Sequence, residues 1–322
     1  MPVAYVYISQ MKNIKRFLSI IVSGTILFLC TYYIIFHFQW RAIFQLLTQV
    51  DLKWFLGGSI GTILLYWMIR TMRWFILLKA ADIHIDIYRL YLVGAISMAL
   101  TTITPLQSGE ALKVELLKKV GALDRVPGYG IFMTEKILDL IIVLLIALLS
   151  LLFGVSKFLD RGTMFAAVAV ILICFTVFFV IIQRIPPNNT VGRFFQPFNQ
   201  CVRTPRLLAS VVLLTIGGWF FVVLGWYACL RSISISVTIL ETSALTAITT
   251  IIGILSLIPG AFGINEVSIS SFLVYLKQDV AMAQAGALII RIYGGMILIL
   301  GFAHFLFWKL TGAGKRTPVN TD

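Results

Sequence analysis

Six ionisable residues stand out in this sequence because they lie within or beside long apolar stretches. They are Glu110, Lys113, Glu135, Asp139, Glu266 and Arg291. A charged side chain at the centre of a bilayer costs about 2.5–3.5 kcal/mol by insertion scales, so such residues should pair with one another or face water. Carboxylates and cations in these places can bind an oppositely charged group or hold a proton. We therefore take these six residues as the first candidates for a binding site.

Glu135 and Asp139 are the closest pair of carboxylates among the candidates. They are four residues apart, so in a helix they share one face, where like charges repel unless a cation lies between them. A second group of candidates contains potential partners: Arg70, Arg73, Asn265 and Glu241. We expect an arginine of this group, or Arg291, to neutralise the pair. The alternatives are an ion-pair network that only holds helices together and, for Arg73 with Trp74, an interfacial anchor.

The composition indicates the class of protein in which these residues are set. Of the 322 residues, 60% are hydrophobic and 12% are charged, whereas a soluble domain is about 45–50% apolar and about 25% charged. This excludes an ordinary soluble enzyme, a disordered chain and a nucleic-acid-binding domain. The net charge of +13 arises from Lys and Arg between apolar runs, as in the cytoplasmic loops of membrane proteins. We predict an all-α polytopic membrane protein.

Six apolar runs are long enough to cross a bilayer, which takes about 20 residues of helix. They cover residues 17–38, 52–69, 137–155, 163–182, 207–230 and 281–308. The first run is too long for the core of a signal peptide, and no small-residue cleavage site follows it. We expect it to remain as the first membrane helix.

Two further apolar runs are interrupted by proline. One stops at Pro105 and the other at Pro259, and a glycine follows each proline four residues later, at Gly109 and Gly263. Proline ends a helix, and glycine, including Gly260 beside the second proline, lets the chain turn. We predict two re-entrant hairpins at residues 88–120 and 237–276. The alternative is two ordinary spans that end in Pro–Gly turns.

The positions of the basic residues favour the re-entrant arrangement. With two re-entrant hairpins, six helices cross, both termini are cytoplasmic, and 19 of the 26 Lys and Arg residues lie in cytoplasmic segments. If the longer arm of each hairpin crossed instead, the numbers would be 13 inside and 12 outside, without the expected excess of cytoplasmic positive charge.

This topology divides one membrane domain, residues 1–322, into two repeats. Residues 1–155 form a span, a span, a hairpin and a span that start from the cytoplasm, and residues 156–308 repeat that order from outside. Residues 309–322 form a cytoplasmic tail. Inverted repeats with paired Gly/Pro breaks are typical of alternating-access transporters, with the binding site at the breaks.

Four segments resemble the transmembrane region of lysylphosphatidylglycerol synthase, a flippase-like membrane family whose members also occur without a synthetase domain. The segments are Arg70-Thr-Met-Arg73-Trp74, TPLQSGEALK, TEKILDL and IPGAFGINE. Three positions depart from the family pattern: Leu106, Lys136 and Ala261. The resemblance implies movement of a polar-headed lipid between leaflets, in a bacterial inner membrane. Expected partners are membrane lipids with anionic or zwitterionic headgroups, and a lipid-biosynthesis enzyme is a further candidate.

The candidate residues then have expected roles. Glu110 and Glu266 could bind a cationic headgroup or a proton, or could cap the returning helices. The N–H groups at Gly109 and Gly263 could hold a lipid phosphate. For Arg291 we expect Glu266 or Asp139 as the acidic partner. The adjacent glycines at 294 and 295 should allow close helix packing.

Two other functions remain open from the sequence. One is a membrane-embedded lipid-modifying enzyme, with Glu135 and Asp139 near its chemistry, and the other is a non-catalytic partner of a lipid-biosynthesis enzyme. The cysteines and histidines show no metal-ligand spacing, and no P-loop is present. We therefore expect no metal and no cofactor, and any energy source would be an ion gradient or the lipid gradient.

Overall fold

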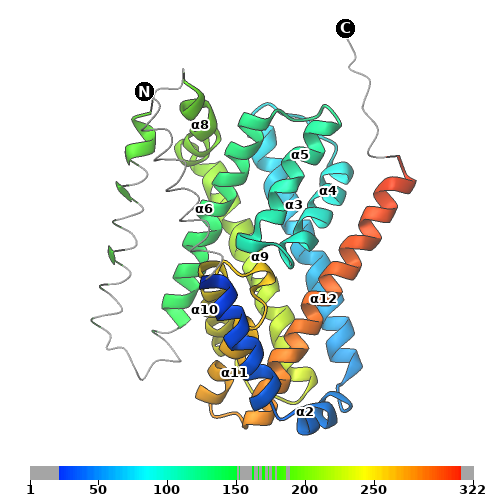
Figure 1. Cartoon of the computed structure of the whole chain (residues 1–322). Helices are drawn as coiled ribbons and strands as arrows, with labels where there is room; N and C mark the ends of the chain where they lie inside the picture. Colours follow the sequence, from blue (N-terminus) through cyan, green and yellow to red (C-terminus); the bar gives the residue numbers. More distant parts are fainter. Residues whose placement is uncertain are drawn as a thin grey trace, which may run out of the picture.

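The computed structural model in Figure 1 describes residues 22–150, 180–185 and 189–312, with scattered positions between 152 and 177. Within these residues every regular element is helical. Most of the predicted run at 163–182 and most of the predicted cytoplasmic tail lie outside the described residues.

Four of the predicted runs coincide with helices that are long and apolar enough to cross a membrane. Three candidate spans are single stretches: Lys53–Ala80, Pro205–Ser232 and Val280–Leu310. The first of these contains η1 (Lys53–Gly57) and α3 (Gly58–Ala80), and the others are α9 and α12. A fourth candidate pairs the helix Val22–His37 with α2 (Trp40–Leu47), bent by 81° at a short break.

The helix α6 (Arg125–Ser150) is 26 residues long and contains part of the predicted run 137–155. Its middle carries Glu135, Lys136 and Asp139 among apolar residues. It packs against α10 (Ile239–Leu255) and against α8 (Thr190–Arg203). The charged middle of α6 is thereby held inside the helix assembly.

The first proline interruption is a sharp turn between α4 (Ile87–Thr101) and α5 (Leu112–Lys119). The short helix η2 (Pro105–Ala111) begins at the proline, and two of its residues have positive φ angles of 54°. A Cβ atom at Gly109 would lie 2.6 Å from the backbone of the α4 residue Leu100. Only glycine fits there, so α5 can fold back onto α4.

The second proline interruption has the same form. The short helix η4 (Pro259–Ala261) begins at the proline and lies between α10 and α11 (Ile264–Tyr275). Gly260 and Gly263 have φ angles of 58° and 80°, which glycine adopts without strain. Residues of η4 contact residues of η2, so the two interruptions meet.

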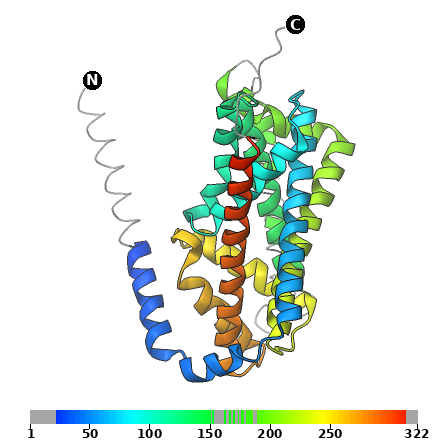
Figure 2. The ribbon, with the colours of Figure 1, turned by 90° about the vertical axis from the view of Figure 1, so that its right-hand side faces the viewer.

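The long helices form a frame around these two turns. In Figure 1, α4 and α5 lie in the upper half and α10 and α11 in the lower half, and Figure 2 shows the same division from the side. The helices α3 and α9 pack along each other, α4 packs on α12, and α10 packs on α6. The first arm of each turn therefore packs on the last long helix of the other half.

Close helix packing occurs at different glycines from those expected. A Cβ atom at Gly301 would overlap Ala99, and one at Gly58 would overlap Ala228. The prediction of close packing at the glycines 294 and 295 is wrong, because nothing lies within 4 Å of a Cβ atom at either. Small residues instead allow close packing where α4 crosses α12 and where α3 crosses α9.

Candidate functional site

Seven charged residues from α3, η2, α5 and α6 form one buried group, which we call the charge cluster. Its members are Arg70, Arg73, Glu110, Lys113, Glu135, Lys136 and Asp139. The cluster contains four cations and three carboxylates. Six of its members are at most 9% exposed. Burial of an unpaired charge is costly, and each of these charges is paired with a charge of opposite sign.

Arg73 lies between the two carboxylates of α6. Its guanidinium is 2.7 Å from Asp139 Oδ1 and 2.9 Å from Glu135 Oε1. It also donates a 2.8 Å hydrogen bond to Thr215 on α9. The expectation that an arginine neutralises Glu135 and Asp139 is confirmed, and the same residue ties α3 to α6 and α9.

Arg70 connects α6 to the first turn. It donates to Asp139 at 3.0 Å and to Glu110 at 2.5 Å. It also donates to the hydroxyl of Tyr66 one turn earlier at 3.1 Å. Both arginines of the second candidate group are therefore central members of the cluster, and Arg73 is not exposed as an interfacial anchor would be.

Glu110 is the residue on which the cations of the cluster converge. In addition to Arg70, Lys113 Nζ is 2.9 Å from Glu110 Oε1, and Lys136 Nζ is 2.5 Å from Glu110 Oε2. Lys113 also pairs with Glu135. A carboxylate held by three cations at the tip of a turn can exchange partners if a ligand displaces one of them.

A second ion pair lies at the other turn. Arg291 on α12 pairs with Glu266, one of its two expected partners, and donates to the carbonyl oxygens of Gly260 at 3.0 Å and Ala261 at 3.3 Å. Its guanidinium lies 4.5 Å from the ring centre of Phe262. This arginine therefore fixes the backbone of η4, where Ala261 has a positive φ angle of 50°, as well as the carboxylate.

The helix-capping alternative holds for Glu266. Its Oε2 accepts the N–H of Gly263 at 2.8 Å at the start of α11. At the first turn, the N–H of Gly109 is donated to Thr104 Oγ1 at 2.8 Å. The prediction that the N–H groups at Gly109 and Gly263 are free for a phosphate is wrong, because both already have acceptors.

The two remaining candidates differ in their surroundings. Glu241 forms a capping box with Thr238 at the start of α10 and takes no part in either charged group among the described residues. Asn265 lies at the second turn, and its buried Oδ1 has no hydrogen-bond partner among the described residues. Asn265 therefore remains a candidate for ligand binding, whereas Glu241 caps the start of α10.

Two adjoining cavities connect the two charged groups. The tip cavity has a volume of approximately 230 Å³ and is lined from both turns, by Gln107 on one side and Asn265, Glu266 and Arg291 on the other. The cluster cavity has a volume of approximately 200 Å³ and is lined by Arg70, Lys136 and Asp139. Eight residues line both: Thr101, Thr102, Gln107, Trp226, Thr250, Ile254, Tyr293 and Ile297.

Sequence reasoning missed several of these wall residues. Lys136 follows Glu135 directly, but in the sequence it stands out only as a departure from the family pattern, although its ammonium group faces Gln107 at 3.3 Å. The dipeptides Thr101-Thr102 and Thr249-Thr250 both line the tip cavity. Each precedes an isoleucine shortly before a proline turn, and this repeated Thr-Thr-Ile could have identified them.

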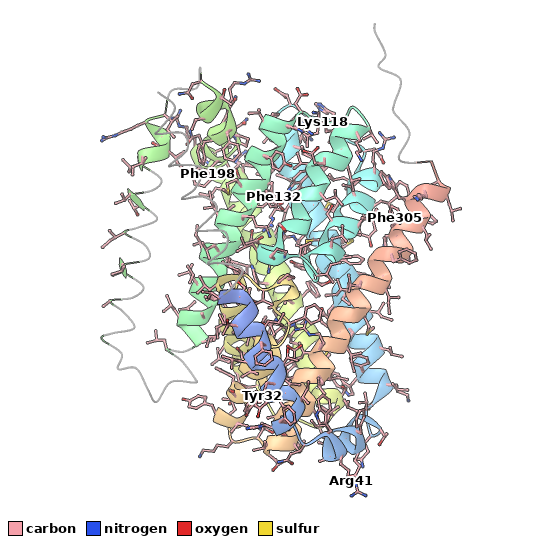
Figure 3. The ribbon with its side chains drawn as sticks, in the orientation of Figure 1. Tyr32, Arg41, Lys118, Phe132, Phe198 and Phe305 are labelled. Carbon is pink, nitrogen blue, oxygen red and sulfur yellow. The ribbon has the colours of Figure 1, made fainter. Side chains whose placement is uncertain are left out.

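The arrangement has the features of a polar binding space inside apolar helices. Figure 3 shows polar side chains inside the helix assembly and the labelled Phe132 in its upper half. Among the described residues, no group of His, Cys, Asp and Glu is arranged to hold a metal ion. The chemistry on offer is ion pairing and hydrogen bonding with a charged or hydroxyl-bearing group.

Comparisons with known proteins agree with the observed architecture. Residues 17–301 match the family described as lysylphosphatidylglycerol synthase TM region. The chain is also 23% identical to the UPF0104 membrane protein PH1989 of Pyrococcus horikoshii, over 86% of this chain and 92% of that protein. The matched range contains both turns and every member of the charge cluster. Together with the apolar helices, it makes the chain an integral membrane protein.

Proposed function

The chain belongs to the lysylphosphatidylglycerol synthase TM region family, and on this basis we propose that it moves a polar-headed lipid between membrane leaflets. The cargo is a phospholipid, or a polyprenyl- or hopanoid-linked lipid, with an anionic or zwitterionic headgroup. The headgroup passes through the tip and cluster cavities while the acyl tails stay in hydrocarbon.

The proposal includes a topology of six crossings and two re-entrant hairpins in inverted repeats. Support comes from the opposite ends at which the two turns begin and from their contact at η2 and η4. Irregular backbone at membrane depth is tolerated where protein buries it or where it lines a polar space. The helix α4 of the first proposed repeat packs on α12 of the second, and α10 of the second packs on α6 of the first. Two repeats that exchange equivalent contacts would produce this pattern.

The distribution of charge supports an orientation with both termini in the cytoplasm of a bacterial inner membrane. Figure 3 labels Lys118 near the upper end and Arg41 at the lower end. The upper end also holds the end of α5, the whole of α8 and the C-terminal end of α12, which carry several further Lys and Arg residues. The positive-inside rule favours the upper end as the cytoplasmic side.

The observation that carries the proposal is the continuity of the two cavities, which are lined by Lys136 at one end and by Glu266 and Arg291 at the other. Glu110 in the cluster and Glu266 at the tip cavity lie on different turns, and each is paired with a cation on a long helix, Lys136 on α6 and Arg291 on α12. A headgroup phosphate that binds Lys136 or Arg291 in place of its paired carboxylate would loosen one turn from its long helix. Alternating release of the two pairs is a path for alternating access.

The enzyme alternative has weaker support. A general base needs a lone pair within reach of the proton that it removes. Both Glu135 and Asp139 are held in ion pairs with Arg73, and Glu135 also pairs with Lys113. These carboxylates are therefore better placed as fixed charges than as catalysts.

A leaflet-accessibility assay tests the proposal. The purified protein is reconstituted into liposomes that contain a trace of headgroup-labelled phospholipid, and quenching of the outer leaflet is followed over time. Wild type should expose the inner-leaflet label, and the Glu110→Gln, Glu266→Gln double variant should do so much more slowly. A capping-site variant, Glu241→Gln, is the matched control and should behave as wild type. Equal rates for wild type and the double variant would exclude the assigned role.

A further inference from the structure

The cavities between the two turns have a wall of threonine hydroxyl groups. Four threonines, two from the end of α4 and two from the second half of α10, line the tip cavity, and three of them also line the cluster cavity. They are Thr101, Thr102, Thr249 and Thr250, which we call the threonine wall. The cavity volumes are approximately 230 and 200 Å³. One water molecule needs only about 10–15 Å³, so these cavities can hold a group of many atoms.

The hydroxyl groups of the threonine wall can accept hydrogen bonds but have no proton left to donate. Each one donates to a backbone carbonyl oxygen three or four residues earlier, at 2.6–2.7 Å. A hydroxyl group has one proton and two lone pairs, so only lone pairs remain for a ligand. Asn265 adds a further acceptor, because it lines the tip cavity and its buried Oδ1 has no hydrogen-bond partner among the described residues. A ligand complementary to this wall therefore brings hydrogen-bond donors.

The donors of the ligand should be uncharged. The two carboxylates among the residues that line the cavities are Glu266 and Asp139. Glu266 pairs with Arg291. Asp139 pairs with Arg70 and Arg73. An ammonium group would have to displace an arginine, whereas a hydroxyl group needs no counter-charge and costs less to bury.

Two cations that line the same space are accessible to a phosphate. Lys136 lines the cluster cavity, and Arg291 lines the tip cavity. Their side chains are 23% and 27% exposed. The side chains of Arg70 and Arg73 are at most 9% exposed. Lys136 and Arg291 are therefore more open to an anionic ligand than the two arginines of the charge cluster.

We propose that the transported headgroup is a phosphate that carries a polyol, with glycerol as the simplest example. This inference rests on the function proposed above and narrows its cargo to hydroxyl-bearing anionic lipids. The phosphate oxygens bind Lys136 or Arg291, and the hydroxyl groups of the polyol donate to the threonine wall. A hydroxyl group that displaces ordered water from the wall replaces the hydrogen bonds of that water, whereas an alkyl group does not. The wall therefore discriminates between headgroups of equal charge.

Two short-chain lipids provide matched probes. Dioctanoylphosphatidylglycerol and dioctanoylphosphatidylpropanol carry the same charge and a headgroup of the same carbon skeleton, but only the first has headgroup hydroxyl groups. Each is titrated into the purified full chain in an amine-oxide detergent, which has no hydroxyl group to compete, and binding is read from the rise in the thermal unfolding midpoint. The glycerol lipid should bind at least about fivefold more tightly, since one hydrogen bond typically changes an affinity by about two- to tenfold.

Two results with these probes would overturn the proposal. One is equal affinity for the glycerol and propanol lipids. The other is equal or tighter binding of dioctanoylphosphatidylethanolamine, whose headgroup donates from an ammonium group, because the cavities would then select charged donors.

Substitutions in the threonine wall show whether the preference arises there. Thr102→Val combined with Thr250→Val removes two acceptors, and the affinity ratio of the glycerol and propanol lipids should fall to about one. Thr102→Ser combined with Thr250→Ser keeps both hydroxyl groups and should retain the preference. The ratio is insensitive to a general loss of stability, because both lipids are measured on the same variant.

Thr242→Val is the matched control for the valine variant. Thr242 also lies on α10 and donates to the carbonyl oxygen of Thr238 at 2.9 Å, but it lines neither cavity. This control should keep the preference of wild type. An unchanged preference in the valine variant of the threonine wall, or its loss in the control, would overturn the proposal.

Transport of the same two headgroups on tail-labelled lipids separates this inference from the proposed function. In liposomes that contain wild type, the glycerol lipid should cross faster than the propanol lipid. Equal rates for both lipids would overturn this inference and leave the proposed function standing. Preferential binding of the glycerol lipid without movement of either lipid would overturn the proposed function and retain the polyol selectivity of the cavities.

Discussion

Gly260 lies so close to the backbone carbonyl oxygen of Thr102 that a Cβ atom on residue 260 would overlap it. The two residues belong to the two different proline turns, which begin at opposite ends of the helix assembly. Gly260 also has a positive φ angle of 58°, and its carbonyl oxygen accepts a hydrogen bond from Arg291. This contact fixes the two turns against each other and forms part of the tip cavity.

Substitution of Gly260 should therefore destabilise the protein. Gly260→Ala introduces a clash with Thr102 and a strained φ angle, which should lower stability by about 1–3 kcal/mol. The measurement is the thermal unfolding midpoint in detergent. Gly61→Ala, which meets nothing within 4 Å, should leave the midpoint unchanged or raise it. A Gly260→Ala protein as stable as wild type would argue against direct contact of the turns.

Removal of Arg73 should be among the most damaging changes to the charge cluster. Arg73→Met leaves Glu135 and Asp139 buried without their shared cation, and breaking a buried ion pair typically costs about 3–5 kcal/mol. The expected result is a large fall in the unfolding midpoint or in the yield of monodisperse protein. Arg125→Met removes the exposed pair with Glu115 and should change little. Similar losses in both variants would contradict the buried network.

Filling the tip cavity should block transport while the fold is retained. Gly294 lines this cavity and has open space at its Cβ position, so Gly294→Leu projects a side chain into the path. We expect the rate of headgroup movement to fall at least about tenfold, equivalent to about 1.4 kcal/mol in the barrier. The neighbour Gly295 also has open space but does not line the cavity, and Gly295→Leu should transport normally. Equal rates in the two variants would place the path elsewhere.

The sequence predicted the local breaks well. Pro105 and Pro259 each open a short helix where the apolar run stops, because proline acts through local backbone chemistry that needs no tertiary information. An acidic partner for Arg291 was also predicted, as Glu266 or Asp139, since a cation inside an apolar helix needs one, and the structure selects Glu266. The division into two repeats, residues 1–155 and 156–308, stays a prediction.

The partners inside the cluster were not predictable in the same way. Whether Lys136 faces Glu110 depends on the rotation of α6 about its axis, which is set by packing against α8 and α10. The failed expectation at Gly294 has a similar origin, because glycine permits close packing but equally permits an open wall. The side of the helix that meets a neighbour decides between these outcomes.

The entry of the two turns from opposite membrane faces is tested most directly by cysteine accessibility in intact cells. The four native cysteines, Cys30, Cys174, Cys201 and Cys229, are first removed. Single cysteines then replace two exposed residues: Lys118, near the C-terminal end of α5, and Lys277, which follows α11. A membrane-impermeant thiol reagent should label Lys277→Cys in intact cells and Lys118→Cys only after permeabilisation. Labelling of both positions from the same side would contradict the account.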